Sequence, residues 1–218
     1  MFIHGGYWQA MDKAEHGLVA PHLTKEGIAV VVPNYGLGPS VSMHEIVRQV
    51  ERAACWVLEE GPSFGLDATR FVVSGHSAGG HPTAMLMSDY WRASDSGLAE
   101  GVFSGGVAIS GLYDLREIPL VPSVNRNTRL DLAQALELSP MFRRPATDAP
   151  LHLVAGRSEL ERFQSQQRAF AAEWKGVATE TYLPVENHYS ILLQFTRPDS
   201  PLLRIVRSAF LRQGSRAD

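Results

Sequence analysis

The feature that most constrains the fold of this chain is a short turn motif between a strand-like and a helix-like segment. An apolar run at residues 71–73 is followed by Gly-His-Ser-Ala-Gly at residues 75–79, and residues 78–90 are compatible with a helix. In a strand–turn–helix unit, small residues let the turn tighten and expose the central serine hydroxyl at the strand's carboxyl end and the helix N-terminus. The motif therefore predicts Ser77 as a nucleophile; a purely structural turn is the alternative.

Short apolar runs alternate with helical patterns along most of the chain. This alternation predicts an α/β fold with a mostly parallel sheet and helices on both faces. We expect strands at residues 1–3, 28–32, 71–73, 102–109, 151–155 and 179–183. We expect helices at residues 43–58, 78–90, 160–175 and from residue 191 onward, and a helix-like run at 130–138.

The length of 218 residues predicts a single domain, 1–218, with one interruption of the alternating pattern. Residues 111–150 are rich in proline, and we interpret them as a cap-like insertion over the mouth of the site. The first strand has only three residues, whereas about five are usual, so the sheet is expected to be N-terminally shortened, with upstream strands missing. An exposed apolar edge invites pairing, and a homodimer is one way to cover it.

Charge and hydropathy exclude several classes of partner. The net charge of −3 with mixed signs does not favour nucleic acid or an anionic membrane surface. No apolar run approaches the ~18 residues of a membrane span, and no signal peptide is recognised, so a cytoplasmic location is expected.

The one cysteine, Cys55, excludes an intrachain disulfide and is expected to be a buried small hydrophobe.

A serine nucleophile needs a base, and the base needs an orienting acid. Of the two histidines that follow residue 81, His152 lies inside an expected strand, whereas His188 lies in the loop after the last strand. His188 is therefore the predicted base. The acid should follow the strand at 151–155, which favours Glu159; Glu161, at the start of the next helix, is the alternative.

The stretch His-Gly-Gly-Tyr-Trp at residues 4–8 supplies the remaining part of the predicted site. Glycines after a strand let backbone N–H groups approach a substrate oxygen closely. Together with the N–H of Ala78, these amides would form an oxyanion hole.

Several motifs resemble the kynurenine formamidase (arylformamidase) branch of the α/β-hydrolases. They are His-Gly-Gly-x-Trp at 4–8, Gly-His-Ser-Ala-Gly-Gly at 75–80, Ser-Gly-Leu-Tyr-Asp-Leu at 110–115, Leu-Ser-Pro at 138–140 and Asn-His-Tyr-Ser at 187–190. The resemblance covers nearly the whole chain and implies Ser77 as nucleophile, Glu159 as acid and His188 as base. It places the oxyanion amides on Gly6, Tyr7 and Ala78. The chain departs from the family in having glutamate where aspartate is frequent, and in lacking further strands before residue 4.

The sequence as a whole predicts a serine hydrolase that cleaves a small amide or ester by way of an acyl-enzyme. The resemblance implies an N-formyl arylamine such as N-formylkynurenine as the substrate; a short-acyl carboxylesterase and a non-catalytic hydrolase-fold binding protein are the alternatives. Tyr7, Trp8 and Tyr113 are candidates for the pocket wall, and ordinary packing is the other interpretation of these side chains. The expected partner is a small acyl substrate, and neither a metal nor an organic cofactor is expected.

Overall fold

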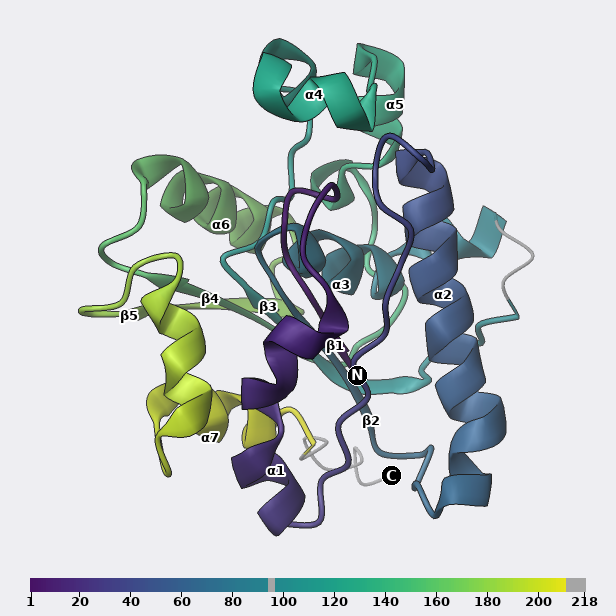
Figure 1. The fold of residues 1–218 in the computed structure, drawn as a ribbon, viewed down its shortest axis with the longest axis vertical. Coiled ribbons are helices and arrows are strands. Elements are labelled where there is room, and N and C mark those ends of the chain that lie inside the picture. Colours follow the sequence, from purple (N-terminus) through teal and green to yellow (C-terminus); the bar gives the residue numbers. More distant parts are fainter. Residues whose placement is uncertain (94–96, 211–218) are drawn as a thin grey trace.

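The centre of the fold is a parallel sheet of five strands (Figure 1). The structure, a computed structural model, describes residues 1–93 and 97–210. The strands lie side by side in chain order and are β1 (Phe2–Ile3), β2 (Phe71–His76), β3 (Phe103–Ile109), β4 (Leu151–Gly156) and β5 (Ala178–Leu183). Because every neighbouring pair is parallel, all carboxyl ends meet at one edge of the sheet.

Helices cover both faces of this sheet, as the alternating pattern predicted. The α-helices are α1 (Pro21–Lys25), α2 (Met43–Glu60), α3 (Gly80–Leu86), α4 (Pro122–Thr128), α5 (Leu132–Glu137), α6 (Glu161–Glu173) and α7 (Pro201–Ser208). The 3-10 helices are η1 (Lys13–Val19), η2 (Gly61–Phe64), η3 (Ser77–Gly79), η4 (Asp89–Ala93), η5 (Ile118–Leu120), η6 (Pro140–Phe142) and η7 (Ser190–Thr196).

The core divides into two clusters, one on each face of the sheet. Neighbouring strand residues point to opposite faces, so Ala108 packs in one cluster and Val107 in the other. The first cluster takes side chains from α2, α3 and α6, and the second from α1, η7 and α7. Strands β2 and β3 are buried throughout, which explains why their sequences are nearly continuous apolar or small-residue runs.

Three sequence-based expectations about the elements are wrong. The closing helix expected from residue 191 onward is interrupted, because η7 ends at Thr196 and α7 begins only at Pro201. The helix expected at 78–90 is split: η3 begins at Ser77, α3 ends at Leu86, and η4 follows. Residues 28–32 form no strand, although all five are apolar and four of them are β-branched. Their one bond to the sheet runs from the N–H of Phe2 to the carbonyl of Val31, at 2.8 Å.

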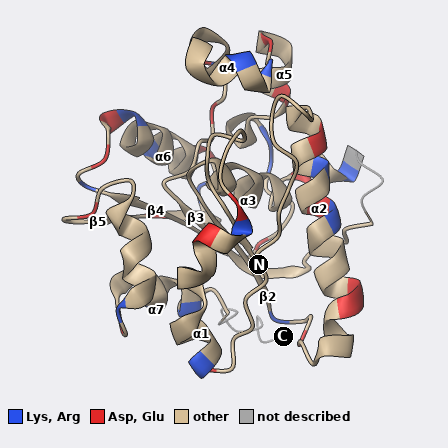
Figure 2. Cartoon of the chain, in the orientation of Figure 1, with Lys and Arg blue, Asp and Glu red and all other residues tan. Residues whose placement is uncertain are grey.

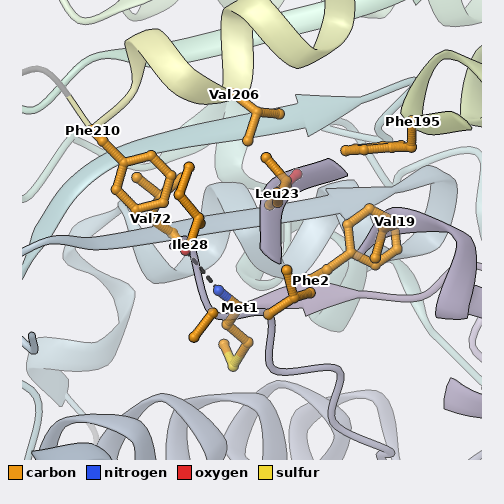
Figure 3. Close-up of a pocket in the computed structure, with 12 residues that line it drawn as sticks. Met1, Phe2, Val19, Leu23, Ile28, Val72, Phe195, Val206 and Phe210 are labelled. Atoms are coloured by element: carbon orange, nitrogen blue, oxygen red, sulfur yellow. Dashed lines mark hydrogen bonds between the residues drawn. The ribbon is translucent and has the colours of Figure 1, made fainter. Parts of the chain in front are cut away.

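Residues 28–32 lie along the outer side of β1 and leave this edge incompletely packed. Figure 3 shows Ile28, Val72 and Phe210 among the side chains that line a small cavity of about 30 Å³ there. The amino group of Met1 closes one side by donating to the carbonyl of Val72 at 2.8 Å. A β-rich sequence needs a pairing partner to become a strand, and among the described residues this segment has that partner on one side only.

Residues 111–150 carry η5, α4, α5 and η6, with α4 and α5 at one end of the molecule (Figure 1). The helix-like run predicted at 130–138 becomes α5, whereas α4 has no counterpart in the sequence-based expectations. Hydrogen bonds tie the segment to the body at several points, and two of them lie near the site residues. Asn127 Nδ2 donates to Gln9 Oε1 at 2.7 Å, and the His81 ring donates from Nε2 to the carbonyl of Leu138 at 2.7 Å.

The surface carries charges of both signs. Figure 2 shows basic and acidic residues interspersed along α2 and α6, in agreement with the mixed sequence composition. Within residues 1–93 and 97–210, no helix combines the length and the apolar character needed to cross a membrane.

The incompletely paired edge at residues 28–32 predicts self-association. Ala29 is exposed there, so Ala29→Lys should place a charge on the edge and reduce the association, because charged edge strands resist pairing. Ala14→Lys, at an exposed position in η1, is the control with the same change of charge. Light scattering over a concentration series measures the mass; a clean wild-type monomer at high concentration would contradict the prediction.

Candidate active site

The predicted nucleophile lies at a tight turn between β2 and α3. Ser77 has φ +55°, a left-handed conformation that is rare for a residue with a side chain. Glycines on either side make this turn possible. A Cβ on Gly75 would lie 2.2 Å from the carbonyl oxygen of Gly79, and one on Gly79 would lie 2.1 Å from the carbonyl oxygen of Ile3. Both positions therefore exclude any larger residue.

A continuous chain of hydrogen bonds joins Ser77, His188 and Glu159. The carboxylate of Glu159 can only accept, so His188 donates to it from Nδ1, at 2.9 Å between Nδ1 and Oε2. This leaves Nε2 of His188 as the acceptor for the Ser77 hydroxyl, also at 2.9 Å. The three side chains predicted from the sequence are thus brought together in the order that general-base activation of a serine requires.

Glu159 is buried and held by more than its contact with His188. Its other oxygen, Oε1, accepts from Ser110 Oγ at 2.6 Å and from the backbone N–H of Gly156 at 2.7 Å. With Oε1 occupied in this way, Oε2 stays directed at His188. Ser110 directly follows β3 and, like Ser77 after β2, has a left-handed backbone, with φ +51°.

The two alternatives considered from the sequence lie elsewhere. Glu161 is exposed at the start of α6 and forms an ion pair with Arg168. His152 lies within β4, where its Nδ1 is 3.2 Å from the hydroxyl of Thr179 on β5. Neither belongs to the hydrogen-bonded chain at Ser77.

The loop after β1 packs directly against the serine turn. A Cβ on Gly5 would lie 3.2 Å from Cβ of Ser77, so a side chain at position 5 would crowd the serine. Gly6 and Tyr7 have φ +106° and +48°. Among the described residues, none accepts a hydrogen bond from the backbone N–H of either, which leaves both donors free for a ligand beside Ser77.

The loop is fixed from behind by aromatic side chains. The Tyr35 hydroxyl donates to the carbonyl of His4 at 2.8 Å, and the rings of Tyr35 and His4 stack at 4.3 Å. Trp8 is fully buried, and its indole meets the His81 ring edge-on at 5.4 Å. The amides at Gly6 and Tyr7 are therefore supported by core packing.

The expectation that Trp8 and Tyr113 form the wall of an open pocket is corrected by their burial. Both side chains have no exposed surface, and Tyr113 stacks on Phe170 at 4.4 Å. Of the three candidates, Tyr7 is the one at the surface, with 37% of its area exposed. A sequence alone does not say whether an aromatic residue beside a site points inward or outward.

Sequence reasoning missed three polar residues around the site, namely His76, Ser110 and Glu186. The His76 ring donates from Nε2 to the backbone carbonyl of His188 at 2.8 Å. Burial, followed by the nearby charge of His188, lowers the pKa of His76 to about 3, so its ring is neutral at ordinary pH. The sequence did carry signals for these residues. Ser110 directly follows a strand, and His76 and Glu186 lie within two residues of a predicted site residue.

Among the described residues, no group of three or more His, Cys, Asp or Glu side chains is placed to hold a metal ion.

Comparisons with known proteins agree with the fold. The family described as alpha/beta hydrolase fold matches residues 1–188. A kynurenine formamidase from Salmo salar is 27% identical, over 94% of this chain and 70% of its own length. The esterase LipI from Mycobacterium tuberculosis is 28% identical, over 73% of this chain and 49% of its own length. The solved structure of esterase B from Lactobacillus rhamnosis has a TM-score of 0.77 at 20% identity, covering 95% of this chain and 74% of that one.

The contact between Gly79 and β1 generates a prediction about stability. Gly79→Ala should destabilise the protein by about 1–3 kcal/mol or more, because backbone atoms of Ile3 and His4 stand where the methyl group must go. Gly17→Ala is the matched control, since a Cβ there meets nothing within 4 Å, and it should stay within about 0.5 kcal/mol of wild type. Urea unfolding measures both; equal effects would show that the close approach is not limiting.

Proposed function

Because this chain belongs to the alpha/beta hydrolase fold family, we propose that it hydrolyses a small amide or ester through an acyl-enzyme formed on Ser77. The observation that carries the proposal is the unbroken chain of hydrogen bonds from Ser77 through His188 to Glu159. In this arrangement Ser77 has the role of the nucleophile and His188, whose Nε2 accepts from the serine hydroxyl, has the role of the base. Glu159, buried behind His188, is the orienting acid.

In the first half of the reaction, Ser77 Oγ attacks the acyl carbon and its proton passes to Nε2 of His188. The negative charge on the former carbonyl oxygen is stabilised by the N–H groups of Gly6, Tyr7 and Ala78. His188 then gives the proton to the leaving nitrogen or oxygen, the bond to the leaving group breaks, and the acyl group remains on Ser77.

In the second half, water repeats the path. It loses a proton to His188 as its oxygen attacks the acyl carbon, and the carboxylic acid leaves as Ser77 recovers the proton. Glu159 accepts from Nδ1 of His188 throughout and stabilises the imidazolium that forms twice in each cycle. With Oε1 held by Ser110 and Gly156, the acid needs no rearrangement between the steps.

For the substrate we propose an N-formyl arylamine such as N-formylkynurenine. The similarity to kynurenine formamidases over 94% of the chain supports this choice. The exposed ring of Tyr7, beside the free amides, offers a surface for an aromatic leaving group. A short-acyl carboxylesterase is the second candidate, and the similarity to the esterase LipI favours it. A binding protein without activity is disfavoured by the intact hydrogen-bonded chain at Ser77.

We further propose that residues 111–150 act as a cap that closes the substrate side of the site. The hydrogen bond from Asn127 on α4 to Gln9, two residues after Tyr7, places this segment next to the loop with the free amides. A cap in this position limits the size of the acyl and leaving groups, which agrees with a small substrate.

Ser77→Ala should abolish turnover, because removing a nucleophile of this type costs on the order of 10⁴–10⁶ in kcat. The measurement compares wild type and variant on N-formylkynurenine and on a p-nitrophenyl ester, with fluorophosphonate labelling of Ser77 as a second readout. A higher kcat/KM on the formamide supports the arylformamidase, and the reverse supports the esterase. A variant that retained more than about a tenth of the wild-type rate would falsify the nucleophile assignment.

Glu159→Gln should lower kcat by about 10³–10⁴, because the amide cannot hold the useful tautomer of His188 or stabilise the imidazolium. Glu161→Gln changes an exposed carboxylate two residues away and should stay within roughly threefold of wild type. Steady-state kinetics on both variants side by side give the ranking. If Glu161→Gln were the slower enzyme, the acid would have to be reassigned.

A further inference from the structure

A second buried carboxylate lies in the histidine loop and has no place in the mechanism above. Glu186 is two residues before His188 and only 3% exposed. A buried carboxylate is costly unless donors surround it. Here the buried carboxylate lies in the loop that carries the proposed base. The contacts of Glu186 therefore indicate its role.

The carboxylate of Glu186 accepts hydrogen bonds from three side chains in or just after η7. Gln194 Nε2 and Arg197 Nη1 donate to Oε1 at 2.6 and 3.3 Å. The hydroxyl of Ser190 donates to Oε2 at 2.5 Å. The two oxygens thus have different neighbours: Oε1 binds the body of η7, and Oε2 binds the residue at which the histidine loop ends.

The contact with Ser190 continues into the backbone on both sides of His188. The oxygen of the Ser190 hydroxyl accepts from the N–H of Asn187 at 2.9 Å. The side-chain oxygen of Asn187 accepts in turn from the N–H groups of Tyr189 and Ser190, each at 2.9 Å. Residues immediately before and after His188 are therefore fixed by a network that begins at the carboxylate of Glu186.

The backbone of Glu186 also connects this loop with the loop of the acid. Its carbonyl accepts from the N–H of Ser158, next to Glu159, at 3.0 Å. A Cβ on Gly156 would lie 2.0 Å from the same oxygen, so the close approach of the two loops leaves no room for a side chain at position 156. A shift of Glu186 would displace His188 and Glu159 relative to each other.

From this geometry we propose that Glu186 is a positioning residue that acts through Ser190 to hold His188 between Glu159 and Ser77. The proposal rests on the proposed function, in which His188 is the base. A misplacement of about 1 Å at such a group can cost about 10²-fold in rate. Loss of the network should therefore reduce kcat by about 10- to 100-fold, while KM stays within about twofold because Glu186 does not touch the substrate.

Four variants separate positioning from a merely structural role. Glu186→Gln removes the charge at constant size, and Ser190→Ala removes only the link to the histidine loop. Gln194→Met removes the hydrogen bond from the body of η7 and leaves the contacts of Glu186 with Ser190 and Arg197 in place. Glu51→Gln, on α2, makes the same substitution at another buried glutamate and is the matched control.

The readouts are kcat and KM on a p-nitrophenyl ester, the rate of fluorophosphonate labelling at Ser77, and the urea midpoint. We expect both kcat and the labelling rate to fall in Glu186→Gln and in Ser190→Ala. The double variant should lose no more activity than the less active of the two single variants. Gln194→Met and Glu51→Gln should lower the urea midpoint but keep kcat within about threefold. Should Glu186→Gln fail to fold, Ser190→Ala tests the same link with a smaller change.

The proposal is overturned if Ser190→Ala keeps kcat within about threefold of wild type, if Gln194→Met loses as much kcat as Ser190→Ala, or if the loss appears in KM instead. Ser77→Ala, assayed in parallel, separates this failure from failure of the proposed function. A wild-type protein that neither turns over the ester nor is labelled at Ser77 refutes both, whereas a labelled, active wild type with an unaffected Ser190→Ala refutes only the role of Glu186.

Discussion

The left-handed backbone of Ser77 is the constraint on which the rest of the site depends. A non-glycine residue pays roughly 1–2 kcal/mol for this conformation, so the surrounding structure must hold it in place. It does so by contact between backbones: Gly79 lies against the carbonyl of Ile3, and Gly5 lies against Ser77 itself. The same contacts fix β1, the loop of free amides and the start of α3 relative to the serine, so the turn and its surroundings form one rigid unit.

Every strand of the sheet contributes to the site from its carboxyl end. β1 leads to the loop with Gly6, β2 to Ser77, β3 to Ser110, β4 to Glu159 and β5 to His188. Parallel pairing of the strands gathers these five segments at one edge of the sheet, although they are far apart in the sequence. The helices on the two faces bury the strands, and the loops at the edge are left to carry the chemistry.

The sequence was informative where a pattern has one physical meaning. Apolar or small-residue runs that are largely buried on both faces predicted β2, β3 and β4. Position after a strand predicted Ser77, Glu159 and His188. Prediction from the sequence failed where the structure of a segment depends on what the segment packs against or pairs with. Residues 28–32 have strand-like composition but incomplete pairing, and α4 has no apolar periodicity because little of it is buried. The inward direction of Trp8 and Tyr113, and the network around Glu186, depend on tertiary contacts that no local pattern encodes.

The burial of Trp8 has a consequence for how enzymes of this type can diversify. The loop that holds the free amides is anchored by a side chain of the core, and a Cβ on Gly6 would lie 2.1 Å from the carbonyl oxygen of Ala10. A substitution that reshapes this loop therefore also damages folding, and selection will remove it before any new activity is tested. Leu120 and Leu132, in the segment 111–150, are largely exposed and can change at little cost in stability. Evolutionary change in substrate range should accumulate on that side of the site, while the loop that holds the free amides stays constant.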